Sequence, residues 1–384
     1  MSLATGTRVG PYEIDSAIGA GEMGEVHAAR DPRRRRPSCL AFAAIGLAGA
    51  ILGAGLMWFA HPSPPHSAVA RVAVPVGPAE NLTAGGISPD APTPGGALTA
   101  FTWSSDGQTL IFVGRRGGVQ RLYLRRLDAA EARPLEGTDG AQVPAVSLDG
   151  RWIAFWARGE IIKAPVAGGP ILDIVTALPH VPWGLAWDED GRLYFGNEAG
   201  GISRVAGYGV PKSVTTLGDG EMSHGLPWPL PGGRALLYTV RKRVGSRGGD
   251  EIVAQKLSTG ERKVVLRDAV DARYVPTGHL VFMRRGRLLA VPFDLDGLEV
   301  SGKELPVLDG VAQALTGPVS TDPTGAGQFA IAATGTLAWL PGRVTSNPYH
   351  EVVTIDGRAQ TSSAPALAYI NIVQNWFEEM KAKR

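Results

Sequence analysis

Short apolar segments alternate with glycine-containing turns along most of this chain. Six of these turns end in glycine, and an aromatic residue follows each glycine four or five residues later, inside an apolar run. Each run has the length and composition of a short buried strand. The glycines are Gly107, Gly150, Gly191, Gly233, Gly278 and Gly335, and the aromatic residues are Phe112, Phe155, Phe195, Tyr238, Phe282 and Trp339.

The spacing of these turns predicts the fold. Successive glycines lie about 41 to 45 residues apart and the last two about 57, and a period near 40 with short strands is typical of β-propellers. We therefore predict an all-β fold, a β-propeller of about six blades over residues 97–357. The last blade is expected to be partial unless a strand at Val72–Val76 completes it. An incomplete ring would leave an open edge, which favours aggregation.

Three of the turns place an aspartate directly before the glycine. Asp106, Asp149 and Asp190 are expected to bond the turn backbone, while the following glycine takes a positive φ. This explanation makes these carboxylates structural rather than catalytic.

A membrane segment is predicted before the propeller. Residues 38–60 carry no charge and are long enough to cross a bilayer as one helix. Arg33–Arg36 precede the segment directly, so the N-terminus should stay in the cytoplasm and the propeller outside it. The alternative is a cleaved signal peptide with a small-residue site at Ser67–Ala70. Gly49 and Gly53 form a small-xxx-small pattern that could pair two such helices in a homodimer.

A glycine-rich loop lies in the first 37 residues. Two predicted strands flank Gly19, Gly21, Gly24 and Val26, which fit G-x-G-x-x-G-x-V. This loop resembles the phosphate-binding loop of bacterial serine/threonine protein kinases, over about 30 residues of the chain. The kinase lysine and the His-Arg-Asp and Asp-Phe-Gly elements are absent from the sequence. We interpret residues 1–37 as a cytoplasmic tail with a kinase remnant, without phosphotransfer activity and without an expected nucleotide.

The propeller has a resemblance of its own. The Ser-x-Asp-Gly turns, and Tyr274–Phe282 followed by Leu289–Leu295, resemble the repeats of TolB-like, WD-like propellers. With the glycine-rich loop, the chain resembles bacterial receptor-type serine/threonine kinases with one membrane helix and an extracytoplasmic propeller. The resemblance implies a protein of the bacterial inner membrane, with residues 61–96 as a linker. Residues 358–384 would be a tail, with an amphipathic helix at Leu367–Lys383.

Candidate chemistry is sparse. The formal net charge of +2 gives no reason to expect a nucleic-acid partner, and the single Cys39 excludes an internal disulfide. No catalytic residue, metal site or cofactor is predicted. One stretch, Gly184–Phe195, resembles a blade of gluconolactonase-type propellers, which hold a metal in the channel. Its acidic residues, Asp188, Glu189 and Asp190, lie in a turn where solvation explains them. The missing kinase elements favour a protein that is not an enzyme, although they leave catalysis undecided.

The function that we expect is that of an extracytoplasmic binding or sensor module with protein or peptide partners. Contacts are predicted at Trp183, Trp228, Arg273 and Tyr274, each of which could instead pack within the propeller. Two alternatives stay open. One is a metal-dependent extracytoplasmic hydrolase or lactonase with its site in the channel. The other is a non-functional truncated relic of a larger kinase.

Overall fold

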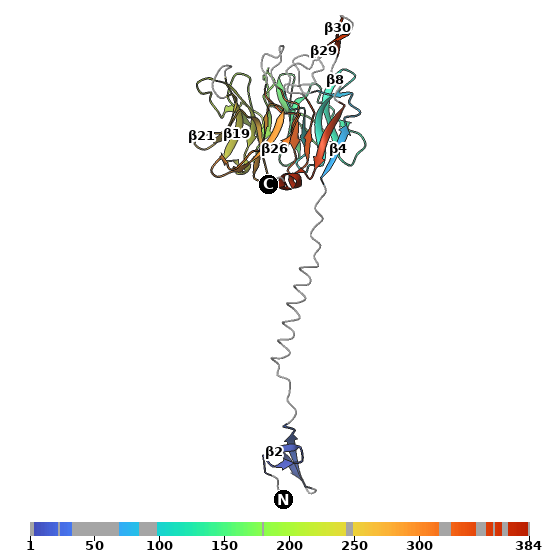
Figure 1. Ribbon diagram of the computed structural model, residues 1–384, viewed down its shortest axis with the longest axis vertical. Helices are drawn as coiled ribbons and strands as arrows, with labels where there is room; N and C mark the ends of the chain where they lie inside the picture. Colours follow the sequence, from blue (N-terminus) through green and yellow to red (C-terminus); the bar gives the residue numbers. More distant parts are fainter. Residues whose placement is uncertain are drawn as a thin grey trace. The chain divides into compact units, whose positions relative to one another are not determined.

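The computed structural model divides into two compact units, Met1–His66 and Ser67–Arg384 (Figure 1). It describes residues 4–21, 24–32, 69–83, 98–178, 180–242, 249–314, 324–342, 351–355, 358–362 and 368–382. The predicted membrane helix, residues 38–60, lies outside these described residues. Within them, no helix has both the length and the apolar character that crossing a bilayer requires.

The first unit contains the glycine-rich hairpin. Its three antiparallel strands are β1 (Arg8–Val9), β2 (Tyr12–Gly21) and β3 (Gly24–Arg30). The two strands predicted around the loop are confirmed. They are longer than expected, since Gly19 pairs with Val26 and Gly21 with Gly24. The glycines therefore form the end of a β-hairpin.

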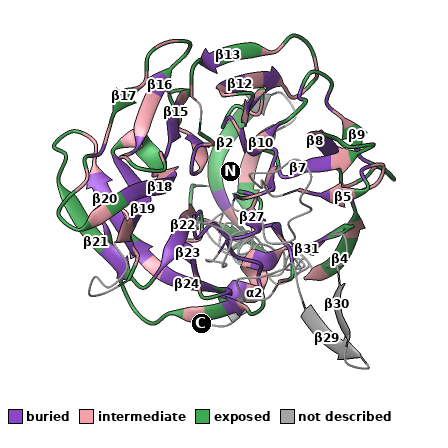
Figure 2. Ribbon diagram, turned by 90° about the horizontal axis from the view of Figure 1, so that it is seen from above, coloured by how far each residue is buried: buried purple, intermediate pink, exposed green. Residues whose placement is uncertain are grey.

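The second unit is a β-propeller. In its described part, six antiparallel sheets surround a central axis (Figure 2). Sheet I contains β5 (Asn81–Leu82), β6 (Phe101–Trp103), β7 (Thr109–Arg116), β8 (Val119–Arg126) and β9 (Arg133–Pro134). Sheet II contains β10 (Gln142–Val146), β11 (Trp152–Ala157), β12 (Glu160–Pro165) and β13 (Leu172–Val175). Sheet III contains β14 (Leu185–Trp187), β15 (Arg192–Phe195), β16 (Ser203–Ala206) and β17 (Lys212–Ser213).

The other three sheets are also antiparallel. Sheet IV contains β18 (Glu221–Pro229), β19 (Ala235–Lys242), β20 (Glu251–Lys256) and β21 (Arg262–Arg267), with the short 3-10 helix η1 (Pro231–Gly233) between the first two strands. Sheet V contains β22 (Val270–Val275), β23 (His279–Arg284), β24 (Arg287–Asp294), β25 (Glu299–Val300) and β26 (Leu305–Leu308). Sheet VI contains β27 (Phe329–Ile331), β28 (Leu337–Trp339), β31 (Tyr369–Gln374) and β4 (Ala70–Pro75). A separate hairpin, β29 (Glu351–Ile355) with β30 (Arg358–Ser362), lies outside these sheets.

An apolar cluster fills each boundary between neighbouring sheets, including the boundary between sheets VI and I. The predicted aromatic positions supply much of this core. Phe112, Phe155, Phe195, Tyr238 and Phe282 are each at most 1 % exposed, on the second strand of their sheets. Trp339, at the sixth position, is only partly buried. Each sheet of the described part of the ring therefore packs on two neighbouring sheets.

The last sheet has four strands, so the blade is not partial, and the prediction that a strand at Val72–Val76 could complete it is confirmed. The strand expected near Val72–Val76 is β4, and all six of its residues pair with β31, from Ala70 opposite Gln374 to Pro75 opposite Tyr369. The propeller therefore extends beyond the predicted limits of 97–357, because it takes one strand from the predicted linker and one from the predicted tail.

The predicted helix at Leu367–Lys383 is wrong in its first half. Ile370, Ile372 and Val373 are buried in β31, and of the described residues 368–382 only α2 (Trp376–Ala382) is helical. Both faces of β31 contact neighbouring sheets, and such a run without clear alternation is hard to tell from a helix. Asn375, at φ 56°, separates the strand from the helix.

The Asp-Gly turns lie along one rim of the ring, called here the turn rim. Asp106 accepts hydrogen bonds from the Ser104 hydroxyl (2.5 Å) and the Gln108 amide (2.9 Å), and Asp149 caps its turn in the same way. In the third turn the capping carboxylate is Asp188, which accepts from the amides of Asp190 and Arg192. The structural role is thus confirmed for two of the predicted aspartates, and Asp188 replaces Asp190 as the third.

Candidate functional site

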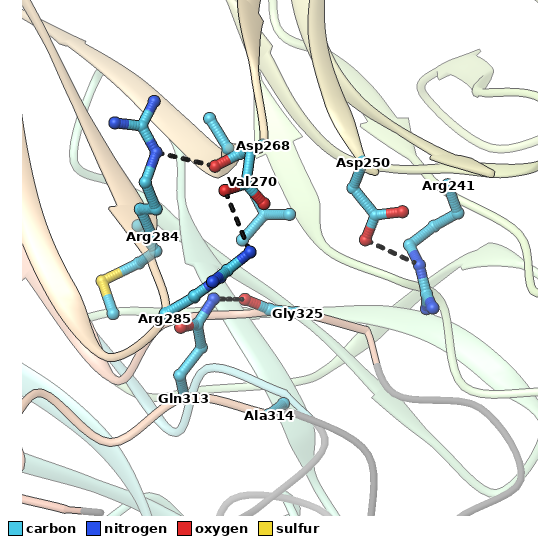
Figure 3. Close-up of a pocket in the computed structure, with 11 residues that line it drawn as sticks. Arg241, Asp250, Asp268, Val270, Arg284, Arg285, Gln313, Ala314 and Gly325 are labelled. Atoms are coloured by element: carbon cyan, nitrogen blue, oxygen red, sulfur yellow. Dashed lines mark hydrogen bonds and ion pairs between the residues drawn. The ribbon is translucent and has the colours of Figure 1, made fainter. Parts of the chain in front are cut away.

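A pocket of about 210 Å³ opens on the rim opposite the turn rim, called here the loop rim (Figure 3). The ends of β19, β22 and β23 contribute to it, together with the connections that follow β19, β21, β23 and β26. The polar residues that line it are Arg241, Asp250, Asp268, Arg284, Arg285 and Gln313. Both signs of charge therefore meet at one mouth of the ring.

The sheet IV side of the pocket is an ion pair. The Nε atom of Arg241 lies 3.1 Å from Oδ2 of Asp250, and both side chains are mostly buried. Asp250 also accepts a hydrogen bond from the Lys242 amide (3.2 Å). The guanidinium carbon of Arg241 is 5.6 Å from the centre of the Trp183 ring, within the range of a cation–π contact. Arg241 is thus held from two sides.

Two consecutive arginines of sheet V differ in how firmly they are held. Arg284 donates to the carbonyl oxygens of Arg267 and Asp268 and forms a two-pronged contact with Glu304 (2.5 and 3.0 Å). The Arg285 side chain is 76 % exposed, and its Nη2 atom is 3.4 Å from Oδ2 of Asp268, itself 53 % exposed. Arg285 is the cation that can turn toward a ligand.

The wall between sheets V and VI is rigid. Gln313 accepts a hydrogen bond from the Gly286 amide (2.7 Å) and donates to the Gly325 carbonyl (3.0 Å). Gly325 has φ 76°, and a Cβ there would approach Val270 to 3.3 Å. Gly286 and Arg285 both have positive φ, as a two-residue hairpin turn requires. The backbone around Arg285 is therefore fixed although its side chain is not.

The four predicted contact residues lie in three environments. Trp183 is 7 % exposed and reaches the pocket only through its contact with Arg241. Trp228 and Tyr274 pack against the apolar cluster between sheets IV and V, and Tyr274 lies edge-on to Phe293. Arg273 pairs with Asp271 and donates to the Phe329 carbonyl (2.7 Å). The structure therefore gives all four residues packing or linking roles within the ring.

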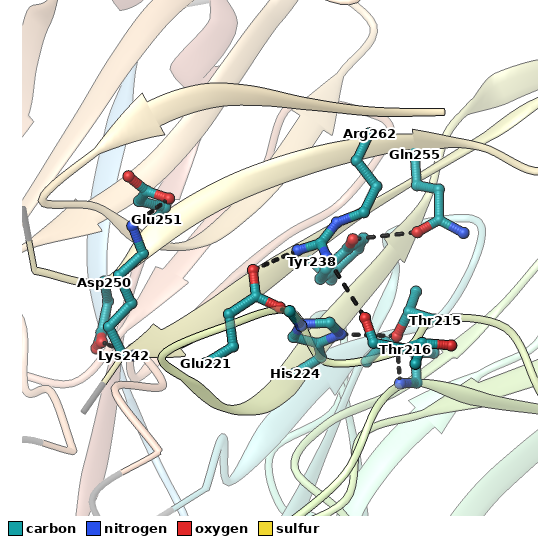
Figure 4. Close-up of polar contacts among 12 residues, drawn as sticks. Thr215, Thr216, Glu221, His224, Tyr238, Lys242, Asp250, Glu251, Gln255 and Arg262 are labelled. Carbon is teal, nitrogen blue, oxygen red and sulfur yellow. Dashed lines mark hydrogen bonds and ion pairs between the residues drawn. The ribbon is translucent and has the colours of Figure 1, made fainter. Parts of the chain in front are cut away.

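A second polar cluster joins sheets III and IV (Figure 4). His224 is fully buried, with Nε2 2.9 Å from Oε2 of Glu221 and Nδ1 2.8 Å from the hydroxyl of Thr215. Thr215 accepts a hydrogen bond from the Ile202 amide (2.7 Å). A neutral His224 imidazole satisfies this series of hydrogen bonds, because it donates to the Glu221 carboxylate and accepts from the Thr215 hydroxyl. Because His224 and Thr215 are buried, the cluster links the sheets rather than presenting a nucleophile.

The charges of this cluster are strongly perturbed. Burial lowers the pKa of His224, although its hydrogen bond to Glu221 opposes that shift. Burial disfavours the Glu221 carboxylate, but hydrogen bonds from Arg262, the Gly218 amide and His224 outweigh it and lower the pKa of Glu221 to about 2. Burial raises the pKa of Tyr238 to about 12. No sequence motif marks this cluster, because its partners come from different elements.

The residues considered as metal ligands serve the turns. Asp188 pairs with Arg192 (2.6 Å), and Glu189 accepts from the Gly232 amide (3.1 Å). Across the described ranges, no group of three or more His, Cys, Asp or Glu side chains could hold a metal ion.

Comparisons with known proteins show no matching family model and no matching curated protein. Solved structures of similar shape include a streptogramin B lyase, which is 12 % identical with a TM-score of 0.47 and covers 81 % of this chain and 99 % of its own. A gluconolactonase from Xanthomonas campestris is 14 % identical with a TM-score of 0.45, covering 82 % and 99 %. An oligogalacturonate lyase in complex with manganese is 12 % identical with a TM-score of 0.44, covering 80 % and 96 %.

These likenesses are too low to transfer an activity or a metal to this chain. The expectation that the chain is not an enzyme is nevertheless corrected: proteins of similar shape include named enzymes, so the fold does not exclude catalysis. The kinase and TolB-like resemblances receive no support from the comparisons.

Proposed function

We propose that residues 67–384 form a closed six-bladed ring that binds a peptide or protein segment at the pocket on the loop rim. The observation that carries this proposal is the meeting of Arg241, Asp268 and Arg285 from two sheets around one pocket. Loops held by a rigid scaffold are where propellers and similar folds place their binding residues.

The size and charge of the pocket favour a macromolecular partner. About 210 Å³ is smaller than the roughly 300 Å³ at which small-molecule sites begin, so the pocket suits one side chain or a chain terminus. The pair between Arg285 and Asp268 is exposed, and such pairs contribute only about 0 to 1 kcal/mol. A partner with a carboxylate and a nearby cation can therefore replace this pair at little cost.

The location of the ring is part of the proposal. Residues 38–60 would anchor the chain in the bacterial inner membrane, with residues 1–37 in the cytoplasm and the ring outside it. A reporter that is active only outside the cytoplasm, fused after Arg384, tests this topology. An active fusion supports the proposal, and an inactive fusion beside an active control contradicts it.

A peptide-library selection on the purified full chain tests binding. We expect selected peptides to bind at least tenfold more weakly to Arg285→Ala and to Asp268→Asn. The matched control is Arg158→Ala, since Arg158 and Gly159 form the same type of two-residue turn in sheet II. Equal loss with the control variant, or no enriched peptide, would contradict the proposal.

Catalysis by the ring is the alternative function, as a metal-dependent hydrolase or lactonase. The same preparation tests it through lactone hydrolysis with EDTA, Ca²⁺ or Mn²⁺. Metal-dependent turnover above the uncatalysed rate would favour this alternative.

A further inference from the structure

A second cleft, of about 620 Å³, lies between sheets I and II on the turn rim. Its lining comes from the first residue of β7, the last residues of β8 and β12, and the turn before β11. The pocket on the loop rim is formed by the opposite ends of the corresponding strands. The two sites are therefore separate, and the cleft has a size typical of small-molecule sites, roughly 300 to 1,000 Å³.

Three arginines from three different elements line this cleft, and none of the described residues that line it is acidic. Arg133 donates from Nη2 to the Val166 carbonyl across the cleft (2.9 Å), which fixes its guanidinium in place. Arg126 forms a two-pronged pair with Asp128 (2.6 and 2.8 Å) at an exposed position. Within the described part of the chain, the guanidinium of Arg151 has no ion-pair partner.

Two further carboxylates interact electrostatically with arginines of the cleft but are engaged within their own turns. Asp106 and Asp149 each accept a hydrogen bond from a serine hydroxyl and from a backbone amide within their own turns. The hydrogen bond from the serine hydroxyl has the largest effect, followed by the one from the backbone amide, and together they lower the pKa of each aspartate. Both carboxylates are therefore ionised at neutral pH. The negative charges of Asp106 and Asp149 weaken the positive electrostatic potential around the arginines of the cleft. A singly charged ion therefore gains little here, and a ligand needs several charges placed to meet separate guanidinium groups.

We propose that this cleft binds a compact organic anion with two or more carboxylate or phosphate groups. Guanidinium groups hold such groups through paired N–H donors, which a point charge cannot do. Arg133 and Arg151 would take separate anionic groups. Arg126 would bind a further anionic group of the ligand in place of Asp128, since exposed pairs of this kind are weak. Leu124 and Pro165 offer apolar contact to the skeleton of the ligand.

Calorimetric titration of the full chain at low salt tests the proposal, with citrate, glucose 1,6-bisphosphate and glucose as probes. We expect one of the two anions to bind, glucose not to bind, and the affinity to fall as NaCl is added. The preferred anion distinguishes a carboxylate ligand from a phosphate ligand. Failure of both anions to bind at millimolar concentration would overturn the proposal.

Variants locate the binding. Arg151→Ala and Arg133→Ala should each weaken binding about tenfold or more, because each removes a charge-assisted contact. Arg151→Lys should recover only part of the loss if the paired donors matter. Arg116→Ala, at the opposite end of β7, is the matched control and should bind normally. Unchanged binding by Arg151→Ala would refute the site. Arg285→Ala changes the pocket on the loop rim and should leave binding of the anion at the cleft unchanged. Arg151→Gln serves if the alanine variant does not fold.

Discussion

Asp271 and Arg273 lie two residues apart on β22 and form a two-pronged ion pair, with both N–O distances at 3.1 Å. The pair connects three sheets. The Asp271 amide donates to the Thr239 hydroxyl of sheet IV (3.0 Å), and the Asp271 carboxylate accepts from the Gly327 amide beside sheet VI (2.9 Å). Arg273 was predicted to contact a partner, and here its guanidinium lies 3.9 Å from the centre of the Phe329 ring.

Breaking this pair should destabilise the ring strongly. Arg273→Ala leaves the buried Asp271 carboxylate without its cation, so we expect the free energy of unfolding to fall by about 3 to 5 kcal/mol. Urea denaturation measures the change. The control is Arg287→Ala, whose pair with Asp309 is exposed and should contribute at most about 1 kcal/mol. Similar losses in the two variants would show that the pair does not link the sheets.

Acid should weaken the ring in two stages. Burial lowers the pKa of His224 below its ordinary 6.5, so as the pH falls His224 takes up a proton in the unfolded chain before it does so in the folded ring. The contribution of His224 to the free energy of unfolding is therefore complete above pH 6.5 and is lost as the pH falls below that value. The pKa of Glu221, about 2 against an ordinary 4.5, adds a second loss between those values. Urea midpoints from pH 8 to pH 3 measure both stages. The variant His224→Gln should lack the first stage, and an unchanged slope between pH 6.5 and 5 would exclude His224 as its cause.

Two neighbouring glycines should respond differently to alanine. A Cβ at Gly201 would overlap the carbonyl of Thr215, next to the His224 cluster, whereas at Gly200 the nearest atom would be 3.6 Å away. Neither residue has a positive φ, so the difference isolates the steric effect. We expect Gly201→Ala to lower the free energy of unfolding by about 2 kcal/mol or more, and Gly200→Ala by about 0.5 kcal/mol or less. Thermal melts of the two variants give the comparison, and equal melting temperatures would disprove it.

Removing β4 should open the ring. A chain that begins at residue 77 lacks the partner of β31 and exposes that strand as an edge, so we expect a broad melt and aggregation. A chain that begins at residue 67 keeps the strand and should melt cooperatively. Light scattering during the melt separates the two cases, and a sharp melt of the shorter chain would mean that β4 is dispensable.

The repeats could be predicted because each depends on local chemistry. A turn needs Gly107 or Gly150 at positive φ, and a buried strand needs an aromatic such as Phe112 or Phe155 at a fixed distance from it. The end of the chain was harder, because Ile370 and Val373 are buried on opposite faces of β31, and this removes the alternation that marks a strand.

The pocket could not be predicted from the sequence. Arg241 lies in sheet IV, Arg285 in a turn of sheet V and Gln313 in the connection between β26 and β27, and only the closed ring brings them together. The same holds for His224, whose neighbours Thr215 and Glu221 lie in a loop and a strand that show no shared pattern.

The pairing of β4 with β31 joins the two ends of the propeller in one sheet. Among the strands of the propeller, β4 leaves the ribosome first and β31 last, so the ring cannot close until every blade has been made. Ala70 and Gln374 lie opposite each other, so the chain enters and leaves the ring at the same end of this ladder. A pull on both ends would load its hydrogen bonds one pair at a time. The ring should therefore open first at sheet VI under tension.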